Sequence, residues 1–322
     1  MSNAIIKQQG DFPVVADNVW NIRAGAGTFI LGMLTGVAGA AVMIRARNAN
    51  RTAKPPTPQN WPIAFIHRGG AAVVPEDTVL GFREGLKYGD AVIECDVHST
   101  LDGELVVMHD ETVDRTTNGT GRINELSYAE IQQLDAGYDF TSDNGSTFPW
   151  RGKGVTVPTL DQIYTEFPDR PVNIEIKKGD HPGIEERVAA AIEAAGAQSR
   201  TLVVSQSRST MQRFREVSNH QVATASSKIE LLGYWLLSLL HLTWLIDPPF
   251  QALQPPENYK GIPIVTRSFV RAAHRQGLRV DVWTIDDEAD MRRLLGYGVD
   301  GIMTDRPDVL ARILGRQPEV SR

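Results

Sequence analysis

The chain has a single cysteine, Cys95, among its 322 residues. One cysteine excludes a disulfide within the chain and leaves the redox compartment open. The sequence also has no low-complexity tract, no repeat of fixed period and no run rich in lysine and arginine. Together with a formal net charge of −6, the missing basic run argues against a general nucleic-acid-binding protein. We therefore expect no nucleic-acid partner.

A glycine-rich phosphate-binding fingerprint is also missing after the first strand-like run, which ends at Ile66. Its absence weakens a dinucleotide-binding interpretation. Strand-like and helix-like runs alternate from there over roughly 250 residues, as in a parallel α/β protein. A closed (β/α)8 TIM barrel over residues 61–316 is the main prediction, and a doubly wound open sheet is the alternative. Residues 111–158 are too long for a simple loop, so we expect a small insertion there, after the third strand.

The N-terminal part does not follow the barrel pattern. Residues 1–23 are polar, and residues 24–44 then form a run of 21 residues without a charge. As a helix, that run is long enough to cross a bilayer core. Residues 45–60 form a basic, proline-rich linker, and their arginines predict a single-pass membrane protein with the following domain on the cytoplasmic face. A buried soluble helix and a signal peptide are the alternatives.

A second apolar stretch covers residues 229–246. Its continuous apolar part, Leu231 to Ile246, has 16 residues, which is short for a membrane span. The aromatic content suits insertion into a membrane interface. A hydrophobic helix that covers the barrel is the other interpretation. We expect an apolar segment at the barrel rim, with membrane contact.

The most informative stretch runs from Ala91 to Asp110 and contains Glu94 and Asp96 in one strand-like run. Side chains alternate along a strand, so both carboxylates face the same side. Two like charges in a sheet repel each other unless a cation or a lysine neutralises them. A solvated edge strand is the simpler alternative.

Polar residues recur where other strand-like runs end. Because the active sites of TIM barrels lie at the C-terminal ends of the strands, we expect these side chains to meet at one mouth. They are His67, Arg68, His109, Glu175, Lys177, Trp283 and Asp305. Asp305, which precedes Arg306 and Pro307, is interpreted as a helix cap.

The composition of this set indicates its chemistry. Glu94, Asp96 and Glu175 form an all-oxygen group, which suits Mg²⁺ or Ca²⁺ rather than zinc. Histidines are suited to acid–base catalysis near neutral pH, and cationic side chains bind anionic substrates. A hard cation, two histidines and two cationic side chains are the groups needed to cleave a phosphodiester.

The motifs that contain these residues resemble those of the glycerophosphodiester phosphodiesterase family. They are His67-Arg68-Gly69, Pro75-Glu76-Asp77-Thr78, Glu94-Cys95-Asp96, His109-Asp110 and Asn173-Ile174-Glu175-Ile176-Lys177. The resemblance extends over about Ile63 to Leu314. It implies a (β/α)8 barrel and metal-dependent hydrolysis of glycerophosphodiesters to sn-glycerol 3-phosphate and an alcohol.

The resemblance also implies a role for each matching residue. His67 and His109 correspond to the acid–base pair. The positions of the metal ligands are taken by Glu94, Asp96 and Glu175, and those of the substrate contacts by Arg68, Lys177, Glu76 and Trp283. Asp77 departs from the pattern, because the family more often has asparagine there, and this affects the expected hydrogen bonding of the loop.

Two other functions stay open at this point. A membrane-tethered barrel with an apolar rim could act on lysophospholipids as a lysophospholipase D, or as a related barrel phospholipase that releases a cyclic phosphate. A catalytically inactive, membrane-anchored binding module is the alternative from another class. The oligomeric state is not indicated by the sequence.

Overall fold

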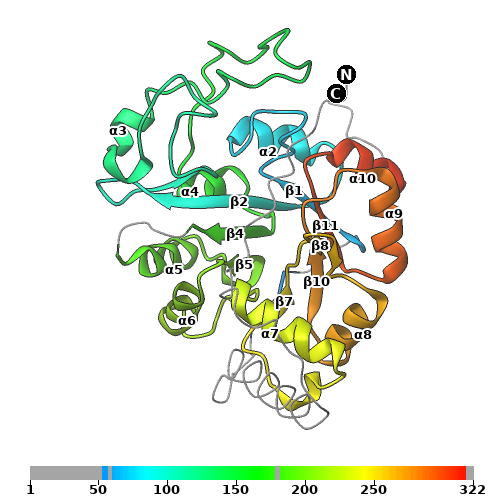
Figure 1. The fold of residues 1–322 in the computed structure, drawn as a ribbon. Coiled ribbons are helices and arrows are strands. Elements are labelled where there is room, and N and C mark those ends of the chain that lie inside the picture. Colours follow the sequence, from blue (N-terminus) through cyan, green and yellow to red (C-terminus); the bar gives the residue numbers. More distant parts are fainter. Residues whose placement is uncertain (1–52, 57–59, 178–181, 317–322) are drawn as a thin grey trace, which may run out of the picture.

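Eight parallel strands form a closed ring in the computed structural model, which describes residues 53–56, 60–177 and 182–316 (Figure 1). The strands are β1 (Ile63–His67), β2 (Val92–Ser99), β4 (Val172–Ile176), β5 (Thr201–Val204), β6 (Ala223–Thr224), β7 (Ala252–Leu253), β10 (Arg279–Val282) and β11 (Gly301–Thr304). Their order is β6-β5-β4-β2-β1-β11-β10-β7, and a parallel bridge between Ala225 and Ala252 joins the two ends. This closure confirms the TIM-barrel prediction and excludes an open sheet.

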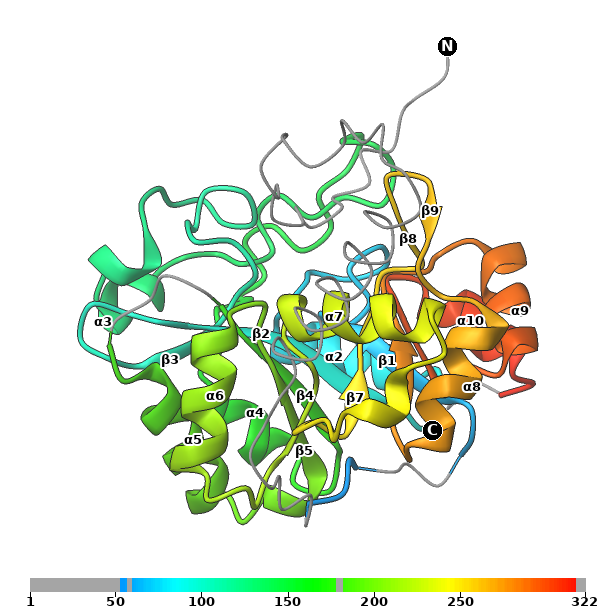
Figure 2. The ribbon, with the colours of Figure 1, turned by 60° about the horizontal axis from the view of Figure 1, so that its bottom comes forward.

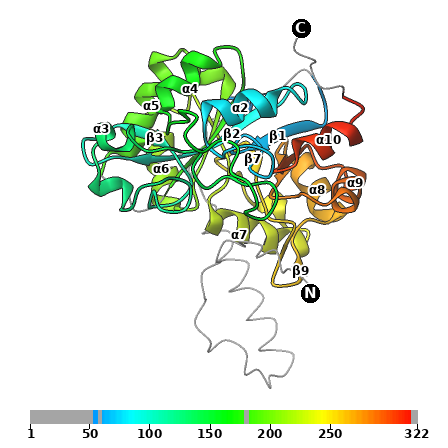
Figure 3. The same ribbon diagram turned by 90° about the horizontal axis from the view of Figure 1, so that it is seen from above.

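Helices cover the outside of the ring (Figure 3). They are α2 (Val79–Leu86), α4 (Leu160–Glu166), α5 (Ile184–Ala194), α6 (Arg208–Val217), α7 (Lys228–Leu239), α8 (Arg267–Arg275), α9 (Glu288–Tyr297) and α10 (Pro307–Ile313). Several begin at a hydroxyl or carboxylate that accepts a hydrogen bond from a free N–H of the first turn, as Thr78 and Asp287 do. The polar residues between the apolar runs therefore set where the helices start.

Strand β3 (Leu105–Val107) does not belong to the ring, although it is the third strand along the chain. It pairs antiparallel with β2, with Val107 opposite Val97. The insertion follows β3 and contains the short helices η1 (Ile123–Glu125) and α3 (Tyr128–Ile131). It has an apolar core of its own, formed by Val106, Met108, Val113, Ile123, Ile131, Ala136, Val155 and Val157. The insertion thus lies between the second and third strands of the barrel.

The apolar stretch at residues 229–246 forms α7 and the short helix η3 (Thr243–Leu245). Tyr234 on the inner face of α7 is fully buried and packs edge-on against Phe250 and Phe269, with ring centroids 6.5 and 6.0 Å apart. The segment is therefore part of the barrel wall. This corrects its expected place at the rim, because a helix with a continuous apolar inner face is driven against the strands.

The predicted membrane-spanning run at residues 24–44 lies outside the described residues, as do residues 1–23 and most of the linker. Within residues 53–56, 60–177 and 182–316, no helix has both the length and the hydropathy needed to cross a bilayer. The membrane-span prediction is therefore not tested by the fold.

Gly69, in the turn after β1, lies against α2. Its φ is +91°, and a Cβ there would lie 2.8 Å from the Gly81 carbonyl carbon and 3.0 Å from the Phe82 nitrogen. We expect Gly69→Ala to lower the free energy of unfolding by about 1–3 kcal/mol, measured by denaturant titration. Gly103→Ala is the control, because Gly103 has a similar φ of +88° and open space around it. Equal losses in the two variants would contradict the close-packing argument.

Candidate active site

Adjacent strands of the ring hold the predicted site residues in register. His67 on β1 lies beside Glu94 on β2, and Asp96 lies beside Glu175 on β4. Neighbouring strands are about 4.8 Å apart, so residues paired in this way are in contact range. The structure therefore brings the three carboxylates and His67 together at the C-terminal ends of the strands.

Two cationic side chains lie among these carboxylates. Lys177 Nζ is 2.8 Å from Asp96 Oδ1 and 3.0 Å from Glu175 Oε2. On the other side, Arg68 Nε is 3.1 Å from Asp96 Oδ2. Burial alone would raise the pKa of Asp96, but Lys177 and Arg68 outweigh it and hold that pKa below its usual range. Asp96 is therefore ionised at neutral pH.

Glu94 has different surroundings. Its side chain is buried, and one oxygen accepts a hydrogen bond from the Arg68 N–H at 3.2 Å. Burial and the negative charge of Asp96 raise the pKa of Glu94 to about 7. The carboxylate form of this residue would be stabilised by an additional cation nearby.

The donor set fits a hard divalent cation. Glu94, Asp96 and Glu175 offer carboxylate oxygens from neighbouring strands, which is the chemistry that Mg²⁺ and Ca²⁺ require. Within the part of the chain that the structure describes, no three histidine, cysteine or carboxylate residues stand in a preformed metal-binding group. Lys177 Nζ bridges two of the three carboxylates instead.

Each predicted acid–base histidine is hydrogen-bonded to a carboxylate. His67 Nδ1 lies 2.6 Å from Asp305 Oδ1, and His109 Nδ1 lies 2.6 Å from Asp110 Oδ1. A carboxylate can only accept, so Nδ1 is the donor and Nε2 is left for the substrate. Burial and Arg68 lower the pKa of His67, but Glu94 and Asp305 outweigh them and raise it above its usual value.

The expectation that Asp305 caps a helix is wrong. The N-cap of α10 is Arg306, and Asp305 pairs with His67. Asp286 Oδ1 positions the Asp305 backbone by accepting its N–H at 2.9 Å. The sequence did not indicate this role, because Asp305 reaches His67 only through the pairing of β11 with β1. That pairing is a feature of the tertiary structure.

Arg115 is a second residue that the sequence did not single out. From the insertion it donates to both oxygens of Glu76, at 2.8 and 2.7 Å, and to Asp110 Oδ2 at 2.6 Å. Glu76 also accepts from Arg68 at 3.2 Å. Burial raises the pKa of Glu76, but its bonds to Arg115 and the charge of Arg68 outweigh this and lower it. Arg115 therefore links Glu76 to Asp110, the carboxylate that accepts the hydrogen bond from His109.

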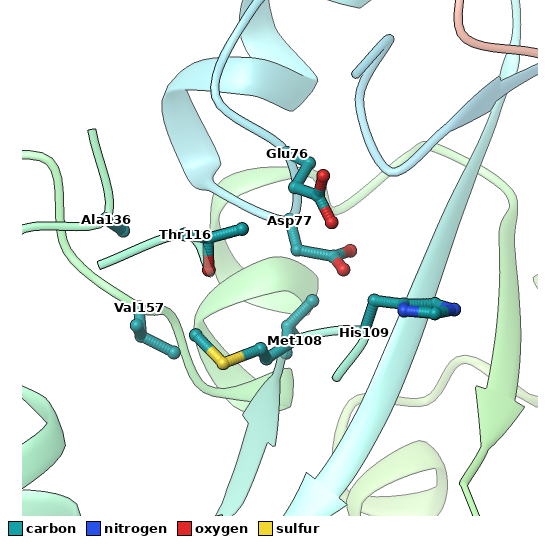
Figure 4. A pocket seen from close by; sticks show the side chains of 8 residues that line it. Glu76, Asp77, Met108, His109, Thr116, Ala136 and Val157 are labelled. Carbon is teal, nitrogen blue, oxygen red and sulfur yellow. The ribbon is translucent and has the colours of Figure 1, made fainter. Parts of the chain in front are cut away.

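Glu76, Asp77 and His109 line a pocket between the mouth and the insertion (Figure 4). Asp77 has a φ of +54°, a left-handed conformation that asparagine and aspartate adopt more readily than other side chains. The change from asparagine therefore fits the backbone of the turn. Neither Asp77 carboxylate oxygen has a hydrogen-bond partner among the described residues, and burial raises the pKa of Asp77 well above its usual range.

Trp283 follows β10 and lies at the same end of the barrel. Its indole Nε1 donates to the Gln254 carbonyl oxygen at 2.6 Å, and the ring packs on the interior cluster that includes Phe65 and Met303. The side chain is partly exposed. The hydrogen bond and the packing hold the ring in place, and its exposed part can form a wall of the site.

Comparison with known proteins gives consistent results. A model of the "Glycerophosphoryl diester phosphodiesterase family" matches residues 67–309. A glycerophosphodiester phosphodiesterase of Caldanaerobacter subterraneus subsp. tengcongensis is 34% identical, over 78% of this chain and 97% of the relative. The crystal structure of a glycerophosphodiester phosphodiesterase from Agrobacterium tumefaciens has a TM-score of 0.62 and 29% identity, over 78% of this chain and 99% of that one. A phosphodiesterase from Oleispira antarctica, solved with the product sn-glycerol-3-phosphate, has a TM-score of 0.60 and 24% identity, over 79% and 96%.

With these relatives, the barrel and its mouth define a phosphoric diester hydrolase. The chain belongs to the glycerophosphoryl diester phosphodiesterase family, which confirms the resemblance seen in its motifs.

Proposed function

We propose that the enzyme hydrolyses glycerophosphodiesters to sn-glycerol 3-phosphate and an alcohol, with His67 and His109 as the acid–base pair. The observation that carries this proposal is the strand register that places His67 beside Glu94 and Asp96 beside Glu175. The Oleispira antarctica phosphodiesterase, with its bound sn-glycerol-3-phosphate, supports the product.

The two histidines divide the proton transfers. Each has Nδ1 bound to a carboxylate, so each presents Nε2 to the substrate. One Nε2 takes the proton of the attacking water, and the other Nε2 donates a proton to the oxygen of the leaving alcohol. The Asp305 and Asp110 carboxylates stabilise the imidazolium form and keep both rings oriented.

Glu94, Asp96 and Glu175 would hold one Mg²⁺ or Ca²⁺ ion. When bound, the ion neutralises negative charge on the phosphoryl oxygens. Arg68 and Lys177 supply positive charge at the same place, which suits the phosphate of a diester. Glu76 and Trp283 are proposed to line the substrate site, and Glu76 also holds Arg68 through a hydrogen bond.

We expect removal of divalent ions with a chelator to abolish turnover, and Mg²⁺ or Ca²⁺ to restore it. Asp96→Asn should weaken metal binding by at least about tenfold, because it removes a charged ligand and leaves Lys177 without its closest partner. Isothermal titration calorimetry of the metal-free protein measures this binding without relying on activity. Full turnover in the chelated enzyme would contradict the metal assignment.

Product analysis tests the substrate class. The full chain would be assayed with glycerophosphocholine and with lysophosphatidylcholine, and the phosphate-containing product would be identified. We expect sn-glycerol 3-phosphate from the first substrate. Faster turnover of lysophosphatidylcholine would favour a lysophospholipase D, and a cyclic phosphate product would favour attack by a substrate hydroxyl.

We also propose that residues 24–44 anchor the chain in a membrane as a single span, with the barrel on the cytoplasmic face. The uncharged run of 21 residues and the arginines that follow it support this proposal.

A further inference from the structure

The barrel has two distinct ends. The site residues lie at the C-terminal ends of the strands, where the β8–β9 hairpin (Asn258–Tyr259 and Ile262–Pro263) projects upward in Figure 2. The opposite end, where the parallel strands begin, is called the base here. A strand of five residues such as β1 is about 16 Å long, so the base is well separated from the mouth.

Exposed tryptophans lie at the base. Trp244 in η3 is 72% exposed, and the neighbouring Leu245 is 46% exposed. Their place at the base follows from Gln276, which ends α8 just before β10 begins and donates to the carbonyl oxygens of Thr243 and Ile246. Leu239 and Leu240, which precede η3, are 54% and 40% exposed.

Trp61 is the second exposed aromatic residue at this end. It is 55% exposed and immediately precedes Pro62 and the first residue of β1. In the ring, β1 lies across the barrel from β6 and β7, which flank α7 and η3 in the chain. Exposed tryptophans therefore mark opposite sides of the base. Tryptophan has an apolar ring and a polar N–H, a combination that favours the surface of a membrane.

The N-terminal end of the described chain lies at the base as well. Ala53 packs against the interior cluster of Leu202, Ala223, Ala225 and Ala252, and the Pro56 carbonyl oxygen accepts a hydrogen bond from Arg279 Nη1 at 2.6 Å. Arg279 is the first residue of β10, three positions after Gln276. Ala53, the first residue that the structure describes, therefore lies at the end that carries Trp244 and Leu245, and the uncharged run precedes it in the sequence.

We propose that the base of the barrel docks on a lipid bilayer through Trp61, Leu239, Leu240, Trp244 and Leu245. The active-site mouth then points away from the membrane. The exposed apolar residues of α7 and η3 serve in membrane contact and not in binding the acyl chain of a substrate. This orientation favours diesters that arrive from the aqueous phase.

The single native cysteine makes a direct test possible, because Cys95 is fully buried and does not compete for a thiol label. Full-length Trp244→Cys and Leu245→Cys proteins would be labelled with a polarity-sensitive fluorophore and reconstituted in phosphatidylcholine–phosphatidylglycerol vesicles. Matched controls are Leu101→Cys and Ile262→Cys, since Leu101 (57% exposed) and Ile262 (53% exposed) are apolar residues on the mouth side.

We expect a blue shift of the emission and quenching by lipid-borne quenchers for labels at 244 and 245 only. Circular dichroism and turnover of glycerophosphocholine in each labelled protein confirm that the barrel is folded. Emission at 244 and 245 that stays unquenched overturns the proposal. Quenching at 101 or 262 also overturns it, because the mouth would then face the bilayer. Neither result would affect the proposed phosphodiesterase chemistry, which the assay in solution tests separately.

Discussion

His67→Ala is expected to lower kcat for glycerophosphocholine by about 10²–10⁴-fold, the usual contribution of a positioned acid or base. The reason is the loss of the Nε2 that lies near Glu94, at 3.9 Å from its Oε2. The same loss is expected for His109→Ala, because each histidine carries out one of the two proton transfers. Steady-state kinetics with the metal-saturated enzyme measures both.

The matched control is His274→Ala. His274 also pairs with a carboxylate, at 2.8 Å from Asp300 Oδ2, but lies in α8 outside the barrel. We expect its removal to leave turnover unchanged. Asp305→Asn should lower kcat more than it raises KM and should change the pH profile, because the neutral amide lacks the negative charge that stabilises the imidazolium form of His67. Wild-type turnover in His67→Ala would disprove the acid–base assignment.

Glu230→Gln is expected to lower the free energy of unfolding by about 3–5 kcal/mol, the cost of breaking a buried ion pair. Arg215 on α6 donates to both oxygens of Glu230 on α7, at 2.8 and 3.1 Å. Both side chains are almost fully buried, at 5% and 3% exposure. The substitution leaves the Arg215 charge without a counter-ion. Denaturant unfolding followed by circular dichroism measures the loss.

The control is an exposed ion pair that joins the same helix, α6, to α5. Arg213 and Glu186 are ion-paired at the surface, so Glu186→Gln should change stability little. Replacing both buried partners, as Arg215→Met with Glu230→Leu, should recover much of the loss, because no unpaired charge is left inside. A small effect of Glu230→Gln, equal to that of Glu186→Gln, would contradict the argument.

The contribution of the Arg215–Glu230 pair to the free energy of unfolding should decrease as the pH is lowered. Burial raises the pKa of Glu230, but Arg215 outweighs it and lowers the pKa below its usual value. A lowered acid pKa stabilises the folded state above the unfolded pKa of about 4.3, and this contribution is lost as the pH falls through the folded pKa. The difference in stability between wild type and Glu230→Gln should therefore be full at pH 7 and shrink in acid.

The alternation of apolar and polar runs was enough to predict a parallel barrel, because each buried strand and each one-sided helix has its own period. It could not show that β3 leaves the ring. Leu105 to Val107 has the composition of a buried strand, and its antiparallel pairing depends on the tight turn at Gly103 and on the space beside β2. In the same way, the apolar composition of residues 229–246 was compatible with a membrane segment and with a helix of the barrel wall. Only the packing of Tyr234 on Phe250 and Phe269 shows that the inner face of this segment is buried against the barrel.

The residue types of the site were readable from the sequence by itself, because Glu94, Asp96 and Glu175 stand at positions where an ordinary strand has apolar residues. Their partners were decided only by tertiary structure. Asp305 lies 238 positions from His67 and reaches it because β11 closes the ring against β1. Arg115 reaches Glu76 only once the insertion lies against the loop between β1 and α2. The local sequence pattern shows which chemistry a side chain can perform. Its partner in the site depends on which distant segments of the chain become neighbours in the folded barrel.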